Sequence, residues 1–183
     1  MRELSLHIMD LIENSLRAQA TIILVSVEAL PDQDLLRIVV EDNGTGLRVP
    51  VESVLDPFYT TKRGKRTGLG LSLFRAAAES TGGRLMIDKS ALGDVGVRVT
   101  VELGLTHIDR NPLGDLAGTL AAAVCTNPAI DFRIRLGVGA RTCELRVWDL
   151  ATEAGVDRCD GLALARVVRA RVQAELQSAA ILT

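Results

Sequence analysis

Two runs rich in β-branched residues, separated by a short polar turn, constrain the fold of this chain most strongly. Residues 21–29 read TIILVSVEA and residues 35–41 read LLRIVVE, with the turn cluster PDQD between them. Runs of this kind around a turn are typical of two antiparallel strands in a hairpin. The second run ends at DNGTG, residues 42–46, where two glycines break the strand. The sequence therefore predicts a sheet with a glycine-rich loop at the end of one strand.

Helical and strand patterns continue on both sides of this hairpin. Apolar residues at helical spacing predict helices over residues 3–18 and 69–80, and a short helix is expected at 50–55. Further strands are expected at 84–89 and 95–104. Aromatic residues make up only 3% of the chain, so the core must consist of Leu, Val, Ile and Ala.

The segment THIDRNP, residues 106–112, is polar, ends in proline and marks a boundary in the chain. The pattern beyond it predicts, in order, a helix, two strands and a helix, at residues 113–124, 130–137, 141–149 and 160–178. We therefore expect one domain over residues 1–105 and an α/β C-terminal extension over residues 106–183.

Composition excludes several classes of protein. Apolar residues make up 48% and charged residues 24%, which is ordinary for a globular protein and argues against disorder. The net charge of −2 lacks the excess of base that a nucleic-acid coat needs. No apolar run reaches the roughly 20 residues of a membrane span, and the acidic start is unlike a secretory signal. We expect a cytoplasmic protein whose three cysteines are reduced, structural thiols.

Three polar groups could carry chemistry. Asp10 and Asn14 lie four residues apart, so they share one face of the first helix, and the Asn oxygen suits a hard cation such as Mg²⁺. The alternative is an exposed polar face. Asp42 follows a strand beside Gly44 and Gly46, so it could accept a hydrogen bond from an exocyclic amine while the chain passes close to a ligand. The alternative is a tight turn with Asp42 as an Asx-turn residue.

The third group is a basic loop, residues 57–68, that leads into a helix. It contains four cations, and Gly68-Leu69-Gly70-Leu71 then opens the helix. Backbone amides at a helix start form an anion site, and glycines let the anion approach closely. The alternative is a solvated charge run followed by an ordinary helix cap.

Together these motifs resemble the GHKL superfamily of ATP-binding domains, which covers histidine kinases, gyrase, the Hsp90 chaperones and the MutL repair proteins. The resemblance covers residues 3–104 and agrees in motif order and spacing. Its elements are the N box at residues 10–16, the first glycine box at 42–46, the phenylalanine box and lid at 56–62, and the second glycine box at 68–71.

The resemblance implies a two-layer α/β sandwich of the Bergerat type, with a mixed, mainly antiparallel sheet and helices on one face. It also implies Mg-ATP as the ligand. Asn14 would coordinate Mg²⁺, Asp42 would accept from the adenine amine, and Gly46 would let the base approach. The remaining implied residues are those of the lid, Thr60, Thr61 and Lys62, and those of the phosphate-binding box, Gly68, Leu69, Gly70 and Leu71.

Three positions depart from the superfamily pattern. Asp10 stands where ATPase members keep a water-activating Glu, and it is one methylene shorter. Arg66 replaces the first glycine of the second glycine box. Val97 follows Gly96 where a threonine usually helps to hold adenine.

Within the superfamily, the lid PFYTTK and the box GLGLSLF resemble the histidine kinase branch, although the N box looks much like that of MutL. His107 begins a stretch similar to a phosphoacceptor box; a polar linker is the alternative. The whole chain also resembles stand-alone ATPase-like proteins whose genes often lie beside iron-only hydrogenase and NADH-dehydrogenase-like subunits. That likeness implies a protein partner of this kind.

Two hypotheses for function follow from the resemblance. The first is a histidine kinase-like enzyme, either a phosphotransferase acting on a partner protein or a slow ATPase, with Asp10 as its catalytic residue. The second is a nucleotide-sensing regulatory module without turnover. Neither nucleic acid nor membrane is expected as a partner.

The first helix is expected almost at Met1, so we expect no counterpart of the edge strand that usually precedes it in histidine kinases. An uncovered sheet edge invites association. A strand of the extension, from the same chain or from a second copy in a homodimer, would cover it. The alternative is a separate tail domain with its own small sheet.

Overall fold

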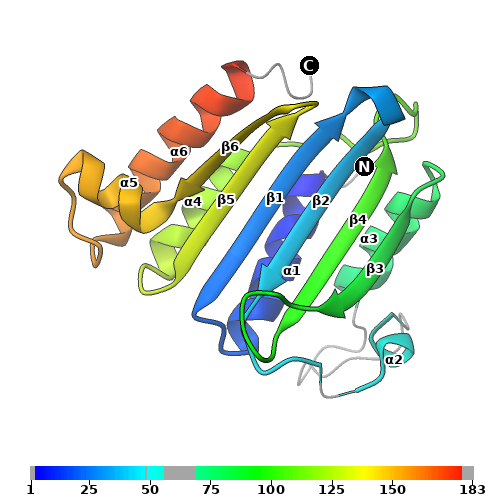
Figure 1. Cartoon of the computed structure of the whole chain (residues 1–183), viewed down its shortest axis with the longest axis horizontal. Helices are drawn as coiled ribbons and strands as arrows, with labels where there is room; N and C mark the ends of the chain where they lie inside the picture. Colours follow the sequence, from blue (N-terminus) through cyan, green and yellow to red (C-terminus); the bar gives the residue numbers. More distant parts are fainter. Residues whose placement is uncertain (1–2, 48, 56–68, 179–183) are drawn as a thin grey trace.

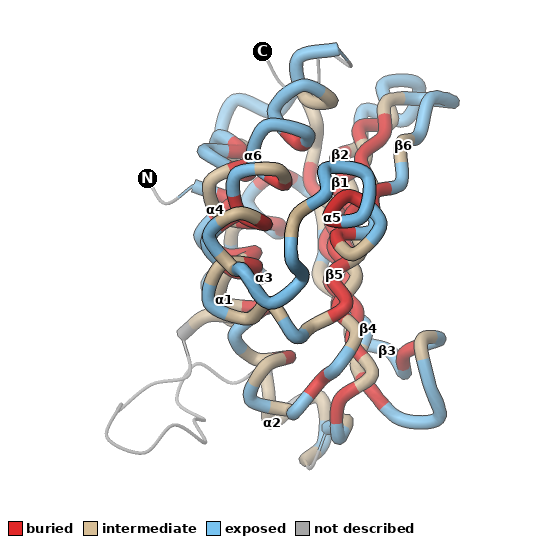
Figure 2. Tube along the Cα trace, turned by 90° about the vertical axis from the view of Figure 1, so that its left-hand side faces the viewer, coloured by how far each residue is buried: buried red, intermediate tan, exposed pale blue. Residues whose placement is uncertain are grey.

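The computed structural model describes residues 3–47, 49–55 and 69–178. Its strands form one six-stranded sheet in the order β3-β4-β2-β1-β5-β6. Helices α1, α3, α4 and α6 cover one face of this sheet (Figure 1), and the edge-on view separates the helix layer from the sheet layer (Figure 2). The expected α/β sandwich with helices on one face is confirmed. The elements are α1 (Leu4–Arg17), β1 (Ile22–Leu30), β2 (Leu35–Asp42), α2 (Val51–Leu55), α3 (Leu69–Glu79), β3 (Arg84–Lys89), β4 (Val97–Gly104), α4 (Leu116–Thr126), β5 (Asp131–Val138), β6 (Arg141–Arg146), α5 (Val147–Ala154) and α6 (Gly161–Ser178).

The predicted hairpin of β1 and β2 is confirmed, and its register places the glycine-rich loop. The two strands pair antiparallel from Leu30↔Leu35 to Ile23↔Asp42. The turn is a short 3-10 helix over Pro31–Gln33, and Asp34 closes it with φ 49°. Asp42 therefore lies at the end of a strand that has neighbours on both sides, β1 and β4.

The sheet continues into the C-terminal extension. β5 pairs parallel with β1 along its length, from Ile22↔Asp131 to Ala29↔Val138, and β6 pairs antiparallel with β5. The predicted covering of the sheet edge by a strand of the extension is confirmed, and the strand comes from the same chain. The separate tail sheet, the alternative, is wrong. Because the other strand pairs are antiparallel, the sheet is mixed, as expected.

One expected element differs from the structure. The sequence predicts a strand over residues 141–149, but β6 ends at Arg146 and α5 follows at once. Val147, Leu150 and Ala151 are buried at helical spacing, and Gly155 ends the helix in the left-handed conformation with φ 65°. The apolar run at the end of the predicted strand is therefore the buried face of a short helix.

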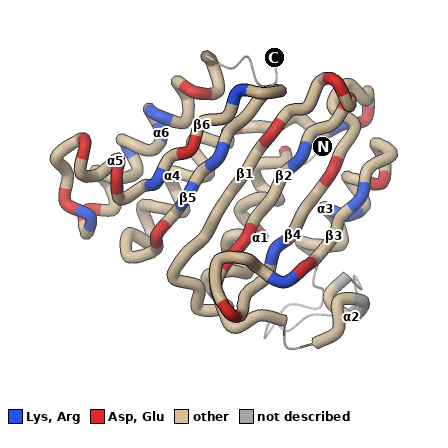
Figure 3. The backbone as a smooth tube through the Cα atoms, viewed as in Figure 1, with Lys and Arg blue, Asp and Glu red and all other residues tan. Residues whose placement is uncertain are grey.

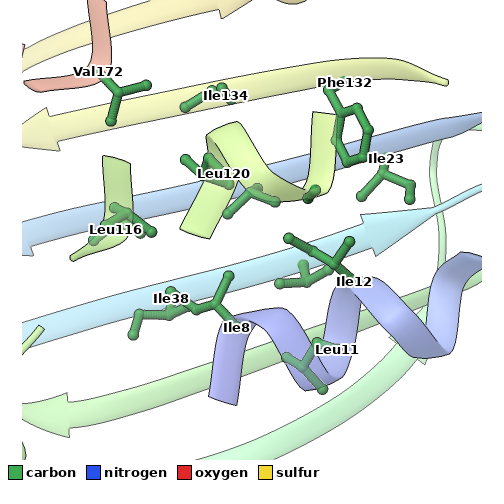
Figure 4. Packing of buried hydrophobic residues seen from close by; sticks show 14 of the residues in the cluster. Ile8, Leu11, Ile12, Ile23, Ile38, Leu116, Leu120, Phe132, Ile134 and Val172 are labelled. Carbon is green, nitrogen blue, oxygen red and sulfur yellow. The ribbon is translucent and has the colours of Figure 1, made fainter. Parts of the chain in front are cut away.

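The core is aliphatic, as the composition requires, and it is continuous across both parts of the chain. Ile8 of α1 lies beside Ile38 of β2 (Figure 4), and Leu11 and Ile12 of α1 belong to the same buried cluster. Leu116 of α4 lies in the same cluster and is fully buried. Burial at about 25 cal/mol per Å² of apolar surface makes this shared cluster the main stabilising term of the fold.

The face of the sheet away from the helices is covered by its own charged side chains. Ser26 and Val39 point to this face from its middle, yet only 3% and 4% of their surface is exposed. Acidic and basic residues alternate across the strands (Figure 3). The ion pairs on this face are Arg37–Glu102, Arg84–Glu102, Arg98–Glu41, Arg133–Asp131, Arg146–Asp131 and Arg135–Glu144.

Candidate functional site

Asp42 is the most strongly fixed polar residue of the predicted site. Its side chain points to the helix side of the sheet, and 5% of the residue is exposed. The Ser15 hydroxyl donates to Oδ2 at 2.7 Å, and the Gly44 amide donates to Oδ1 at 2.8 Å. The Val97 amide approaches Oδ1 at 3.4 Å. Because donors hold both oxygens, the carboxylate has one defined orientation, and Oδ2, which has a single donor, has room for a further one.

The loop after Asp42 lies directly on the end of α1. The Thr45 amide donates to the carbonyl oxygen of Ala18 at 2.9 Å. A Cβ at Gly44 would lie 2.7 Å from the same oxygen, so a side chain there would push the loop off the helix. Gly46 adopts φ +74°, and a Cβ at this position would meet Val95 at 2.9 Å. Gly44 is therefore required by the close approach of the α1 backbone, and Gly46 by its positive φ and the nearby Val95 side chain.

Asn43 ties this loop to the start of β1. Its Oδ1 accepts from the backbone amides of Thr21 at 2.9 Å and Ile22 at 2.8 Å, and its Nδ2 donates to the Thr21 hydroxyl at 2.9 Å. Sequence reasoning assigned no role to Asn43 or to Ser15. The signal for Asn43 is its place inside the glycine box, where an Asn side chain often bonds nearby backbone.

The turn between β3 and β4 closes the site from another side. Gly96 adopts φ +134°, and a Cβ there would lie 2.1 Å from the carbonyl oxygen of Asp42. Glu41 faces the opposite side of the sheet and accepts from the Ser90 hydroxyl at 3.0 Å, which anchors this turn. Val97 lacks the hydroxyl that a threonine would supply at this position, but its backbone amide still reaches Asp42.

On α1, Asp10 lies on the side that faces α3. A Cβ added to Gly70 would lie 3.4 Å from both Cβ and Oδ2 of Asp10, so Gly70 lets the first turn of α3 approach this carboxylate. Farther along the two helices, the His7 and Phe74 rings stack with centroids 4.8 Å apart. The structure therefore brings Asp10 next to Gly70, one residue of the predicted phosphate-binding box, with His7 as part of the packed helix interface.

Asn14 and Leu71 are also described. Asn14 is partly exposed on α1, and its Oδ1 accepts from the Arg17 guanidinium. Leu71 is partly buried and packs against the core, so its side chain is structural. α3 begins at Leu69, in agreement with the predicted helix start. The predicted lid residues Thr60, Thr61 and Lys62 and the first residue of the box, Gly68, lie outside the described residues.

Within the described part of the chain, no group of three or more His, Cys, Asp or Glu side chains could hold a metal ion. This does not conflict with an Mg²⁺ site of the expected kind. Mg²⁺ keeps several waters and is commonly bound through one or two protein oxygens plus substrate phosphates, so a single Asn oxygen beside a nucleotide fits its chemistry.

His107 lies at the opposite end of the sheet from Asp42. It follows Gly104, the last residue of β4, whereas Asp42 is reached by the amide of Val97, the first residue of β4. A strand of this length spans about 25 Å. The His107 Nδ1 accepts from the Asp109 amide at 3.1 Å. Asp42 and His107 therefore lie at opposite ends of β4.

The three cysteines form no disulfide, and the pKa of one of them is raised. Burial, and next the nearby Glu175 carboxylate, raise the pKa of the Cys143 thiol above its ordinary value. Cys143 lies on β6, far along the sheet from Asp42. It therefore belongs to the packing of the extension.

The order of the motifs, the sandwich and the geometry around Asp42 together define an ATPase domain of the GHKL type. Residues 2–107 match the family of histidine kinase-, DNA gyrase B- and HSP90-like ATPases. The match spans more than half of the 183 residues, so the chain belongs to this family. Membership of this ATPase family supports nucleotide binding by the chain.

The relatives differ in how much of this chain they resemble. The sensor kinase CckA of Brucella abortus (strain 2308) is 36% identical over 104 residues, which are 56% of this chain and only 11% of that protein. Among solved structures, the N-terminal domain of a DNA repair protein matches with a TM-score of 0.52 at 15% identity, covering 80% of this chain and 52% of that chain, which shows a shared fold. The Aquifex aeolicus MutL ATPase domain complexed with ADP matches with a TM-score of 0.47 at 19% identity, covering 88% of this chain and 66% of that chain.

None of the helices in the described part of the chain combines the length and the apolar character that a bilayer span requires.

Proposed function

We propose that this protein binds Mg-ATP and uses it as a histidine kinase-like enzyme, either a phosphotransferase acting on a partner protein or a slow ATPase. The observation that carries the proposal is the Asp42 carboxylate. It is buried, it is held by Ser15 and Gly44, and it lies at the end of a strand beside glycines that allow close approach. An oriented acceptor of this kind selects a ligand with an exocyclic amine, and adenine has one.

The other proposed roles follow the geometry of α1 and α3. Asn14 would supply one oxygen to Mg²⁺ after releasing the guanidinium of Arg17. The amides of Gly68, Leu69 and Gly70 would hold phosphates at the start of α3. Bound Mg-ATP would supply an activated phosphoryl group, and the lid residues Thr60, Thr61 and Lys62 would exclude water around it.

Asp10 decides whether the protein is an enzyme in its own right. The carboxylate lies beside Gly70, on the side of α1 where the phosphates would be bound. A carboxylate there could accept a proton from an attacking water, which is the role of a general base. Because Asp is one methylene shorter than Glu, we expect slow hydrolysis.

The second candidate function is a nucleotide-sensing module without turnover. The shortness of the Asp10 side chain favours it, since a base that does not reach the water leaves binding intact and hydrolysis negligible. In this case the bound nucleotide would change the affinity for a partner protein.

One assay separates the two functions. Phosphate release and radiolabel transfer from ATP should be measured for the wild type, Asp10→Asn and Asp10→Glu. Glu13→Gln is the matched control, because Glu13 is an exposed acid on the same helix and is paired with Arg17. Turnover that falls in Asp10→Asn and not in Glu13→Gln supports the enzyme. Nucleotide binding without turnover in any variant supports the sensor.

We further propose that residues 1–105 carry the nucleotide site and that residues 106–183 serve contact with a cytoplasmic protein partner. The resemblance to hydrogenase-associated proteins makes iron-only hydrogenase and NADH-dehydrogenase-like subunits the candidates. Binding of purified subunits to the full chain, with and without Mg-ATP, tests this. No binding in either condition would refute these partners while leaving the nucleotide site untouched.

A further inference from the structure

The segment that joins β4 to α4 holds the first turn of α1. The Leu4 amide donates to the Pro112 carbonyl at 2.9 Å, and the Ser5 amide donates to the Leu113 carbonyl at 2.8 Å. The first amides of a helix have no partner within the helix. The linker therefore supplies acceptors that α1 itself does not contain, since the residue before the helix, Glu3, makes no side-chain cap bond.

Gly114 makes this arrangement possible. It adopts φ +75°, so the chain can present the two carbonyls to α1 and then turn into α4, which Asp115 caps by accepting from the Gly118 amide at 2.7 Å. Glu3 lies tightly against this turn. A Cβ at Gly114 would lie 2.1 Å from Oε2 of Glu3 and 2.7 Å from its Cβ.

The other end of the same helix holds the nucleotide-site carboxylate. Ser15 is 2% exposed and donates to Asp42 at 2.7 Å. Asp10 lies between the two ends of α1, beside Gly70. α1 runs over Leu4–Arg17, so a shift at its first turn moves a helix about 21 Å long that carries each of these side chains.

We propose that Pro112–Gly114 is a positioning element of the nucleotide site, through which the C-terminal extension sets the affinity for ATP. This inference rests on the proposed function. α4 packs on α1 and on α6, so movement of the extension reaches the site through one rigid helix. Reciprocity requires that bound ATP also stabilise the start of α4.

Gly114→Ala tests the proposal. The new Cβ would lie 2.7 Å from the Cβ of Glu3, and ordinary contact begins at 3.4 Å. The backbones of the linker and of α1 must therefore separate by several tenths of an ångström. Because ligand contacts depend steeply on position, we expect roughly a tenfold loss of ATP affinity by calorimetry.

Gly155→Ala is the matched control. Gly155 also has positive φ, at +65°, but a Cβ there meets nothing within 4 Å. It ends α5, which packs on α6, β5 and β6. Both variants carry the backbone strain of a positive φ, and Gly114→Ala adds the clash with Glu3, so both should lose thermal stability and Gly114→Ala should lose more; only Gly114→Ala should lose ATP affinity. Adding Glu3→Gly to Gly114→Ala removes the clashing side chain and should restore the affinity.

Equal ATP affinity in Gly114→Ala and Gly155→Ala would overturn the inference, and so would failure of Glu3→Gly to restore binding. A wild type that does not bind ATP at all would instead overturn the proposed function, and the inference with it. If Gly114→Ala does not fold, hydrogen exchange of the wild type decides. Mg-ATP should slow exchange of the Gly118 and Thr119 amides at the start of α4, and the Gly155 amide should not respond; no slowing at Gly118 and Thr119 would overturn the proposal.

Discussion

Asp42→Asn should weaken ATP binding while leaving the fold intact. Both amide donors of this carboxylate, from Gly44 and Val97, reach Oδ1, and the Ser15 hydroxyl reaches Oδ2. An Asn oxygen can keep the two amides, and the Asn NH₂ group then takes the place of Oδ2. The Ser15 hydroxyl can accept from this group, because a hydroxyl both donates and accepts. The unfolding free energy should therefore change little.

The adenine amine, unlike the Ser15 hydroxyl, can only donate a hydrogen bond. An NH₂ group at the place of Oδ2 cannot accept from the adenine amine, so a donor on the ligand would meet a donor on the protein. A buried polar group left without its partner costs about 1–3 kcal/mol. This corresponds to a dissociation constant raised by a factor of about 5 to 150.

Calorimetry with two nucleotides isolates this contact. Purine ribonucleoside triphosphate lacks the amine of ATP and is otherwise the same ligand. The wild type should bind ATP more tightly than the purine analogue, and Asp42→Asn should lose most of this preference. Such a cycle measures the coupling between one side chain and one ligand group. Equal weakening of both nucleotides would refute the assignment, because Asp42 would then act on the fold and not on the amine.

Ser15→Ala gives a graded version of the same experiment. It removes the donor to Oδ2 and leaves the carboxylate and its amide donors in place. We expect ATP affinity to fall by less than in Asp42→Asn, with the preference for the amine retained. Complete loss of that preference would mean that Ser15 itself contacts the base.

Three further predictions test the metal, the extension and the titrating thiol. Asn14→Ala should abolish the Mg²⁺ dependence of ATP binding in calorimetry; Mg²⁺ that still tightens ATP equally would exclude Asn14 as the ligand. A chain cut after Leu105 lacks β5 and the linker, so it should be aggregated or unable to bind ATP in size-exclusion and binding assays; a soluble monomer with unchanged affinity would contradict this. Burial and Glu175 raise the pKa of the Cys143 thiol, so the folded state keeps a proton that the unfolded state loses; stability should fall as pH rises from the ordinary thiol pKa through the raised one, and Cys143→Ser should flatten this decline in thermal unfolding.

The hairpin and the strands after it could be predicted because their signals are local. The β-branched runs and the polar turn at 31–34 fix β1 and β2 without help from the rest of the chain. α5 could not be predicted in this way. Leu145 of β6 and Val147 of α5 flank Arg146 in a strand-like alternation, and the change from strand to helix period occurs directly after it. The left-handed Gly155 after Ala154 was the available signal.

The residues of the candidate site also differ in whether the local sequence reveals them. Asp42, Gly44 and Gly46 stand in a motif that the sequence displays directly, and the structure places them together. Ser15 looks like an ordinary small residue on a helix. It acquires a role only because the end of α1 approaches the end of β2, and that approach depends on the packing of the whole helix layer. No local pattern contains this information.

The extension belongs physically to the sheet that it completes. β1 has the burial of a central strand, with Ile23 and Val27 fully buried, and β5 supplies its second neighbour. Without β5 the amides and carbonyls on one side of β1 would lack partners, and an unpaired central strand invites association with other chains. The boundary at residue 105 therefore separates two functions in the proposal, whereas the hydrogen bonds and the core cross it. A partner that binds the extension would act on the same folded unit that holds Asp42.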